Sequence, residues 1–138
     1  MPFVEIRILE ASDLPSGDLN GKSDPYVYVS TSKGEIRTEV KKCTLNPTWN
    51  EIVVMEIGDP LKDAVGLQVY DWDRVGKHDF LCGCSIMVND LIPGVPKEGQ
   101  FDLWKIDKKA WKKEKKKGAS SPPLKNCGKI HLIIRALD

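Results

Sequence analysis

A period-two alternation of apolar and polar residues recurs along most of this chain of 138 residues. In the first such segment Val4, Ile6 and Ile8 share one face, whereas Glu5 and Arg7 share the other. Successive side chains of a strand point to opposite faces, so the pattern is typical of a strand with one buried face. A chain built mainly from such segments has to bury those faces against one another, which favours an all-β fold.

Turn-forming pairs such as Lys33-Gly34 and Asn46-Pro47 separate these segments. Short strands at this spacing are typical of an antiparallel β-sandwich, and a chain of this length is long enough to bury one core. We therefore expect a single domain over residues 1–138, folded as an eight-stranded antiparallel β-sandwich. The expected strands cover residues 4–9, 26–31, 35–41, 52–57, 66–71, 81–88, 99–104 and 129–136.

A lysine-rich excursion over residues 105–128 is expected between the last two strands. Residues 105–117 hold eight lysines against Asp107 and Glu114, a charge of 8 − 2 = +6 in a chain of net charge +1. Asp107 is a suitable N-cap for a short helix that carries Trp111. These lysines are either a solvated surface or a basic patch for anionic lipid. The candidate patch is Lys108, Lys109, Lys112, Lys113, Lys115, Lys116 and Lys117.

Five aspartates lie in two short windows that contain glycine, one over residues 17–26 and one over residues 70–80. Carboxylate oxygens are the ligands that hard cations such as Ca²⁺ prefer. A small sandwich would bring both windows to one end, where the carboxylates would repel each other unless a cation bridged them. Two ions, with a total charge of +4, balance five carboxylates better than one. The predicted ligands are Asp18, Asp24, Asp71, Asp73 and Asp79.

Three other interpretations of these aspartates compete with this one. An EF-hand loop starting at Asp18 does not fit, because Ser23 stands where glycine is required and Val29 stands where glutamate is required. Aspartate and glycine also build turns, which is an alternative for any one of the five. A metal-assisted hydrolase would need a further base or nucleophile, and the two histidines, His78 and His131, assemble no such set. We therefore expect a binding module, not an enzyme.

The motifs that surround the aspartates resemble a known family when they are taken together and in order. The resemblance is to the C2 domain, a calcium- and phospholipid-binding β-sandwich, and it runs nearly from end to end. The first and last strands of this chain resemble the type II topology of that family. The motifs are Leu14-Pro15, Gly21-Lys-Ser-Asp-Pro-Tyr-Val27, Thr44-Leu-Asn-Pro-Thr-Trp-Asn-Glu51, Val69-Tyr-Asp-Trp-Asp-Arg74 and Lys77-His-Asp-Phe-Leu81.

The resemblance implies a ligand set for calcium. Asp18 and Asp24 would belong to the first calcium-binding loop, and Asp71, Asp73 and Asp79 would belong to the third. Backbone carbonyls near Gly17, Trp72 and Lys77 would complete the coordination shells. Gly76 stands where some relatives have a hydroxyl group for a further ion, so at least two Ca²⁺ ions are expected and the hydroxyl ligand for a third is missing.

The loop tips are predicted to contact a membrane. Without calcium, about five negative charges would hold this end away from anionic phospholipid, and two ions would reverse most of that repulsion. Docking would then be shallow and reversible, because the tips offer few apolar side chains. The alternative is a calcium-stabilised domain that binds a protein partner without useful lipid affinity. The predicted membrane contacts are Leu19, Lys22, Val75, Lys77 and His78.

Further expectations concern partners and location. Some relatives bind phosphoinositides through the strand before Leu45, but here Arg37 is accompanied by Glu39, so such a site would be weak. Nucleic acid is not an expected partner, because Trp111 is the only aromatic residue among the lysines. The N-terminus lacks the pattern of a secretory signal, and the four cysteines are expected to be reduced. We expect a cytoplasmic monomer that associates peripherally with membranes in the presence of calcium.

Overall fold

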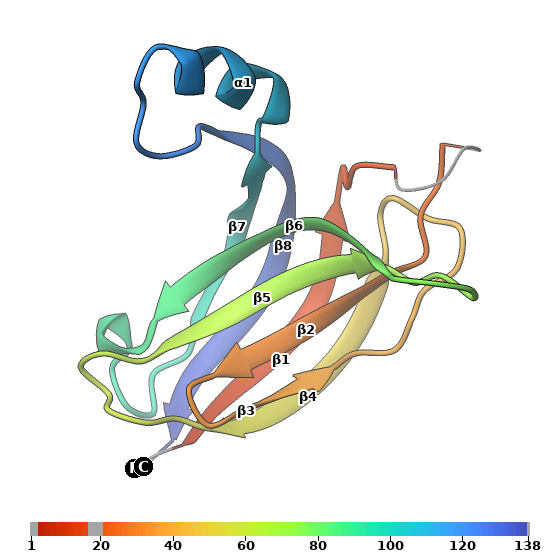
Figure 1. Ribbon diagram of the computed structural model, residues 1–138. Coiled ribbons are helices and arrows are strands. Elements are labelled where there is room, and N and C mark those ends of the chain that lie inside the picture. Colours follow the sequence, from red (N-terminus) through yellow and green to blue (C-terminus); the bar gives the residue numbers. More distant parts are fainter. Residues whose placement is uncertain (1–2, 17–20, 138) are drawn as a thin grey trace.

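The computed structural model describes residues 3–16 and 21–137 (Figure 1). Within these ranges almost all regular structure is β, and the strands lie close to the positions that the alternation predicted. The expected all-β fold is confirmed. In chain order the elements are β1 (Phe3–Ser12), β2 (Pro25–Thr31), β3 (Gly34–Arg37), β4 (Thr48–Glu56), β5 (Ala64–Asp71), β6 (Asp79–Met87), the 3-10 helix η1 (Val88–Asp90), β7 (Lys97–Ile106), α1 (Lys108–Lys116) and β8 (Leu124–Leu137).

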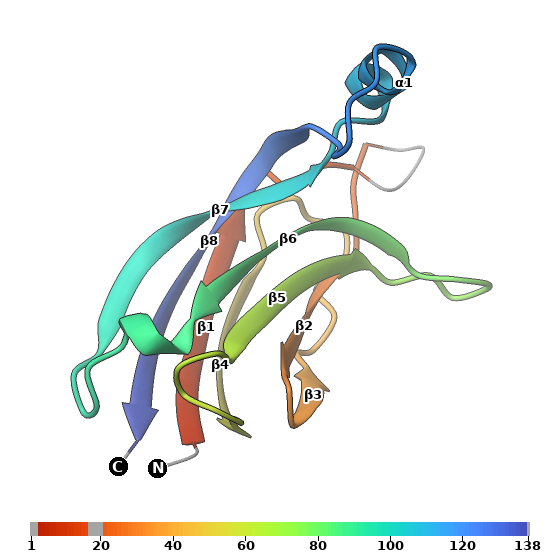
Figure 2. The same ribbon diagram turned by 60° about the vertical axis from the view of Figure 1, so that its left-hand side comes forward.

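The eight strands form one antiparallel sheet in the order β3-β2-β5-β6-β7-β8-β1-β4. β6 and β7 share a single register pair, Gly83 with Trp104, so the sheet folds over at this seam. The result is two layers, β3-β2-β5-β6 and β7-β8-β1-β4, as Figure 2 shows from the side. The predicted sandwich is therefore confirmed. Phe3 at the start of β1 is the register partner of Leu137 at the end of β8, so the first and last strands are neighbours.

The core lies between these two layers. Val4, Ile6 and Ile8 of β1 have no exposed surface, as the alternation predicted. Val65, Leu67 and Val69 of the opposite layer are also fully buried, and so are Ile130, Leu132 and Ile134 of β8. Burying an aliphatic side chain of this size contributes about 1.5 to 3 kcal/mol. The two layers are thus held rigidly, and this fixes where the strand ends and their loops lie.

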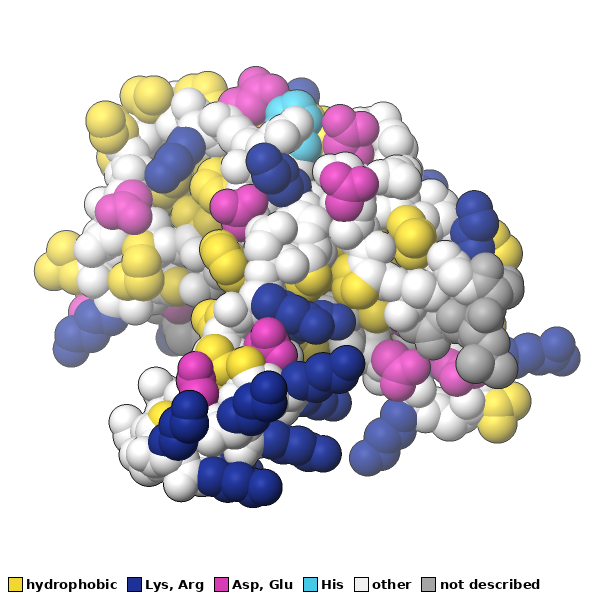
Figure 3. All heavy atoms as spheres, turned by 90° about the horizontal axis from the view of Figure 1, so that it is seen from above, with side chains coloured by type: hydrophobic (Ala, Val, Ile, Leu, Met, Phe, Trp, Pro, Cys, Tyr) yellow, Lys and Arg dark blue, Asp and Glu magenta, His cyan; other side chains and the backbone are white. Residues whose placement is uncertain are grey.

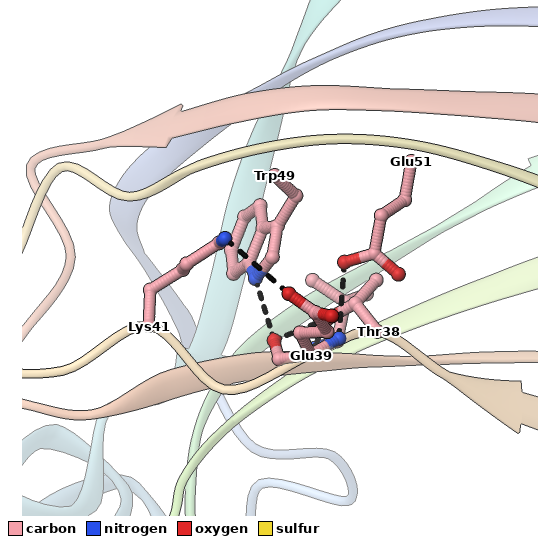
Figure 4. Close-up of polar contacts among 6 residues, drawn as sticks. Thr38, Glu39, Lys41, Trp49 and Glu51 are labelled. Carbon is pink, nitrogen blue, oxygen red and sulfur yellow. Dashed lines mark hydrogen bonds and ion pairs between the residues drawn. The ribbon is translucent and has the colours of Figure 1, made fainter.

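The strand expected over residues 35–41 ends at Arg37. Residues 38–41 are held by backbone hydrogen bonds from Thr38 N to the Val27 carbonyl and from Lys41 N to the Pro25 carbonyl, and by side chains as well (Figure 4). Thr38 Oγ1 accepts a hydrogen bond from Val27 N at 2.9 Å. The indole nitrogen of Trp49 donates to the Glu39 carbonyl at 2.9 Å, and Glu51 Oε2 accepts from Glu39 N at 3.0 Å. These side chains satisfy backbone groups that a neighbouring strand would otherwise pair.

The connection between β7 and β8 is shorter than the excursion expected over residues 105–128. Lys105 pairs with Lys125 and Ile106 pairs with Leu124, so both strands extend into the expected loop and only residues 107–123 connect them. The expected helix is present as α1, and Asp107 caps it by accepting a hydrogen bond from Ala110 N at 3.1 Å. α1 has no buried residue and projects from the sandwich (Figures 1 and 2). No helix within the described ranges has the length and apolar character needed to cross a bilayer.

Candidate metal centre

Three of the predicted ligands lie at the ends of three adjacent strands. Asp71, the last residue of β5, is the register partner of Pro25 on one side and of Asp79 on the other. Asp24 directly precedes Pro25, and Asp73 follows Asp71 in the β5–β6 connection, which extends from this end in Figure 1. The two sequence windows therefore meet at one end of the sandwich. Gly17, Asp18 and Leu19 of the first window lie outside the described residues.

Backbone amides orient three of these carboxylates. Asp71 is only 3% exposed, and its Oδ1 accepts a hydrogen bond from Asp24 N at 2.8 Å. Asp24 Oδ1 in turn accepts from Cys43 N at 2.7 Å, and Asp73 Oδ1 accepts from Val75 N at 3.1 Å. Within residues 3–16 and 21–137 the hydrogen bonds to Asp24 and Asp73 reach Oδ1 only. Each of these two side chains therefore keeps its Oδ2 for a further ligand.

The donor set fits Ca²⁺ in its chemistry, because it consists of carboxylate and carbonyl oxygens on loops. In the described part of the chain no three His, Cys, Asp or Glu side chains are already gathered as a metal group. Asp73 and Asp79 are exposed, and like charges at this end repel each other.

The base of the β5–β6 connection is anchored near Asp24. Trp72 N donates a hydrogen bond to the Asp24 carbonyl at 2.9 Å. The ammonium group of Lys42 lies 3.9 Å from the centroid of the Trp72 ring, a cation–π distance. Because Trp72 is held in this way, the backbone of its two neighbours, Asp71 and Asp73, is held in a defined position as well.

The other end of the connection is held by His78. The Tyr26 hydroxyl and His78 Nδ1 form a hydrogen bond, and the His78 ring lies edge-on to the Tyr26 ring with centroids 5.4 Å apart. Burial raises the pKa of Tyr26 above its ordinary value of 10.0; Tyr28 and Tyr70 act in the same direction and Arg37 opposes them. The Tyr26 hydroxyl is therefore protonated at neutral pH, and it donates a hydrogen bond to His78 Nδ1 in the tautomer in which that nitrogen carries no proton.

The sequence did not predict the roles of Tyr26, Lys42 and Cys43, which hold the backbone and the side chains of the candidate metal centre in place. Tyr26 lies within one of the family motifs, but its partner His78 is far away in the sequence. No local pattern links such a pair, because the contact follows from the register of β2 with β5 and of β5 with β6.

The described residues among the predicted membrane contacts differ in exposure. Val75 is 78% exposed at the tip of the connection, next to Gly76, whose positive φ of 89° turns the chain there. Lys22 and Lys77 are exposed as well, whereas His78 is half-buried by its contact with Tyr26. Val75 and Lys77 are thus exposed in the β5–β6 connection, whereas His78 helps to hold that connection through its contact with Tyr26.

The seven lysines of the candidate basic patch are all exposed. Figure 3, which views the molecule from above, shows dark blue side chains gathered over α1. At the separate position suggested for phosphoinositides, Arg37 lies over the Tyr26 ring at 5.1 Å and Glu39 forms an ion pair with Lys41 at 3.6 Å. The positive charge of this chain is therefore concentrated on α1 and not beside β3.

Comparison with known families and proteins gives a consistent result. The profile of the C2 domain matches residues 3–103. Synaptotagmin-3 of Arabidopsis thaliana is 40% identical over 106 residues, which cover 75% of this chain and 20% of that protein. Ras GTPase-activating protein 4 of Mus musculus is 33% identical over 131 residues, 95% of this chain and 15% of that protein. The chain thus spans a small part of the curated relatives that it matches.

Solved structures share the fold. A C2 domain of plant extended synaptotagmin 1 superposes with a TM-score of 0.78 at 24% identity, covering 99% of this chain and 92% of that one. A calcium-bound fragment of extended synaptotagmin 2 that contains a pair of C2 domains gives a TM-score of 0.73 at 24% identity, covering 97% and 45%. At these identities the likeness concerns the fold.

Proposed function

This chain belongs to the C2 domain family, and from that membership we propose that it is a non-catalytic module that binds Ca²⁺ through two loops and docks reversibly on anionic phospholipid membranes. We place it on the cytoplasmic side of those membranes, as a peripheral protein. Carbonyls near Gly17, Trp72 and Lys77 would complete the coordination shells of two ions. The carboxylates that would hold these ions are Asp18, Asp24, Asp71, Asp73 and Asp79.

The observation that carries the proposal is the register of β2, β5 and β6. It sets Asp24, Asp71 and Asp79 at neighbouring strand ends, although they come from two distant parts of the sequence. An aspartate that only forms a turn acts within its own loop, so turn formation does not explain why aspartates from two distant windows lie at neighbouring strand ends. A C2-containing fragment of the same fold that is described as calcium bound adds support.

Charge explains why docking would depend on calcium. The carboxylates at the loop end repel an anionic bilayer, whereas bound Ca²⁺ supplies positive charge and coordination positions that lipid phosphate oxygens can fill. Val75 and Leu19 would add at most about 1.5 to 3 kcal/mol each on insertion, and Lys22 and Lys77 about 1 kcal/mol each. These contributions are modest, so docking would be reversible.

Sedimentation with vesicles of phosphatidylcholine and phosphatidylserine tests the proposal. We expect the protein to bind in calcium and to be released by a chelator at physiological salt. The double substitution Asp71→Asn plus Asp73→Asn should abolish both this binding and most of the heat of calcium titration. An asparagine at either position keeps a side-chain oxygen that accepts the same backbone hydrogen bond, so the fold should survive.

The matched control is Asp90→Asn plus Asp102→Asn, which removes the same charge at exposed positions in η1 and β7, outside the two aspartate windows. This control should bind calcium and vesicles as the parent does. Vesicle binding that is indifferent to calcium would contradict the proposal. Calcium titration with normal heat but no vesicle binding would instead favour the alternative, a calcium-stabilised domain for a protein partner.

A further inference from the structure

A cavity of about 510 Å³ lies where α1 joins the sandwich. Four elements contribute to it: the start of β6, the end of β7, the first residues of α1 and the start of β8. The cavity exists because β7 and β8 continue past the seam and carry α1 away from the β6 layer. Its lining consists of Phe80, Lys105, Ile106, Asp107, Lys108, Lys109 and Lys125.

The charge of this lining is strongly positive. Four lysines face one carboxylate, Asp107, which gives 4 − 1 = +3. The Asp107 carboxylate already accepts a hydrogen bond from Ala110 N as the cap of α1. Among the described residues no ion pair joins any of the four lysines to a carboxylate. Lys105 and Lys125 are register partners in the β7–β8 ladder, so the backbone brings these two like charges together.

Exposed apolar side chains border the same cavity. Phe80 is 48% exposed and Ile106 is 45% exposed, and both line it. Leu124, the register partner of Ile106, is 59% exposed. A ligand with phosphate groups beside an apolar region suits this combination, as a phospholipid at a bilayer surface does. Single-stranded nucleic acid needs several flat aromatic faces on which successive bases stack, and Phe80 is the one aromatic side chain among the described residues that line this cavity.

The cavity opens at the same end of the sandwich as the candidate metal centre. Consecutive strands are antiparallel, so the β5–β6 and β7–β8 connections both emerge opposite the end where β1 starts and β8 finishes (Figures 1 and 2). Phe80 of the cavity directly follows Asp79 of the metal end. In Figure 3 the lysines over α1 and acidic side chains farther along appear on the same face. One bilayer is therefore able to contact both sites.

We propose that the cavity between β6, β7, β8 and α1 binds the phosphate groups of an inositol lipid headgroup within a bilayer, without the help of calcium. The several phosphates of such a headgroup match a lining of charge +3 better than a singly charged headgroup does, and charge-assisted hydrogen bonds to phosphate are strong. The inference rests on the proposed membrane function. It differs from that function in two respects, because the cavity lies apart from the calcium ligands and binding there does not require calcium.

The test compares two variants of equal charge. Lys105→Gln plus Lys125→Gln alters the cavity and leaves α1 intact, whereas Lys112→Gln plus Lys113→Gln removes the same charge from α1 outside the lining. Binding is measured in chelator to phosphatidylcholine vesicles that contain phosphatidylinositol bisphosphate. Both variants lose long-range attraction, but only the first loses direct contacts, so its affinity should fall about tenfold further. Equal losses in the two variants would overturn the cavity as the site.

Other arms separate the remaining explanations. Phosphatidylserine vesicles of equal total charge should bind less tightly in chelator than the inositol lipid vesicles, and equal binding would overturn the headgroup assignment. Soluble inositol trisphosphate should compete with the vesicles for the protein, but it should bind more weakly than they do. Equal affinity for the two would show that the ligand is the free inositol phosphate and not a lipid in a bilayer. A cavity variant that loses affinity for single-stranded RNA but not for the vesicles would also overturn the inference. In calcium the cavity variant should still bind phosphatidylserine vesicles, so failure of the metal site is detected separately.

Discussion

Asp63, directly before β5, holds two connections together at the end of the sandwich opposite the candidate metal centre. Its carboxylate accepts hydrogen bonds from Gly58 N at 2.7 Å, Ser32 Oγ at 2.8 Å, Ala64 N at 2.9 Å and Ser32 N at 3.2 Å. Burial by itself raises the pKa of Asp63, but these hydrogen bonds outweigh burial and hold the pKa below its ordinary value of 3.8. The ionised form is thus the one that stabilises the fold.

Replacing Asp63 with Ala should lower the free energy of unfolding by about 1 to 3 kcal/mol, because buried donors lose their acceptor. The folded-state pKa is lowered, so the parent's stabilisation is complete above pH 3.8 and is lost as the pH falls through the folded-state pKa. Urea unfolding over a pH series should show this loss in the parent and not in the variant. Asp102→Ala, at an exposed position in β7, should change stability little, and equal destabilisation by both changes would contradict the role of Asp63.

At the scale of the element, α1 is stabilised locally and not by burial. The Asp107 cap satisfies one amide at its start, and Lys113, Lys115 and Lys116 in its last turn favour the negative end of the helix dipole. The Lys115 ammonium also lies 5.3 Å from the centroid of the Trp111 ring. No residue of α1 is buried, so this helix should open without unfolding of the sandwich.

The substitution Asp107→Ala tests this independence. Loss of the N-cap should destabilise α1 by about 1 kcal/mol, which would speed hydrogen exchange about fivefold at the Trp111 amide and by at least as much at the Ala110 amide, which loses its acceptor. The urea midpoint of the sandwich should stay unchanged. Glu114→Ala removes the same charge at the other end of α1, and exchange at these two amides should then stay near the parent rate. A fall in the midpoint for Asp107→Ala would show that α1 and the sandwich unfold together.

For the whole molecule, the seam between β6 and β7 decides whether one sheet becomes two layers. Gly83 is the residue of β6 that pairs with β7, and a Cβ built there would lie 2.9 Å from the Leu67 carbonyl oxygen of β5. A backbone atom cannot move aside as a flexible side chain does. Only glycine therefore lets β5 and β6 approach this closely beside the fold of the sheet.

Gly83→Ala should accordingly destabilise the protein by about 1 to 3 kcal/mol, the usual cost of overpacking. Gly99→Ala in β7 is the control, since a Cβ there meets only side-chain atoms of Phe101 at 3.6 Å or more. That change should be neutral or slightly stabilising, because alanine restricts the unfolded chain. Urea unfolding of the two variants measures the difference, and equal stabilities would rule out the close approach at the seam as a constraint.

The sequence by itself determined the features that depend on local pattern. Alternating apolar residues predicted the eight strands, because the period of two is a property of each segment alone. Asp71 and Asp73 are one residue apart and follow a β-type segment, and this pattern predicted metal ligands in a loop. Asp107 predicted the start of α1. The motif between residues 44 and 51 was recognised because its residues are consecutive.

Only the tertiary structure decided which distant residues meet. The hydrogen bond of Tyr26 with His78, the end of β3 at Arg37 and the facing pair Lys105 and Lys125 all follow from strand register. Register results from the packing of two whole layers, and a shift of one residue would turn every side chain to the other face. A local pattern carries no information about that choice. The five candidate calcium ligands were therefore predicted from the sequence and stay a prediction, whereas the residues that support this end of the sandwich and the lysine-lined cavity beside it were not predicted.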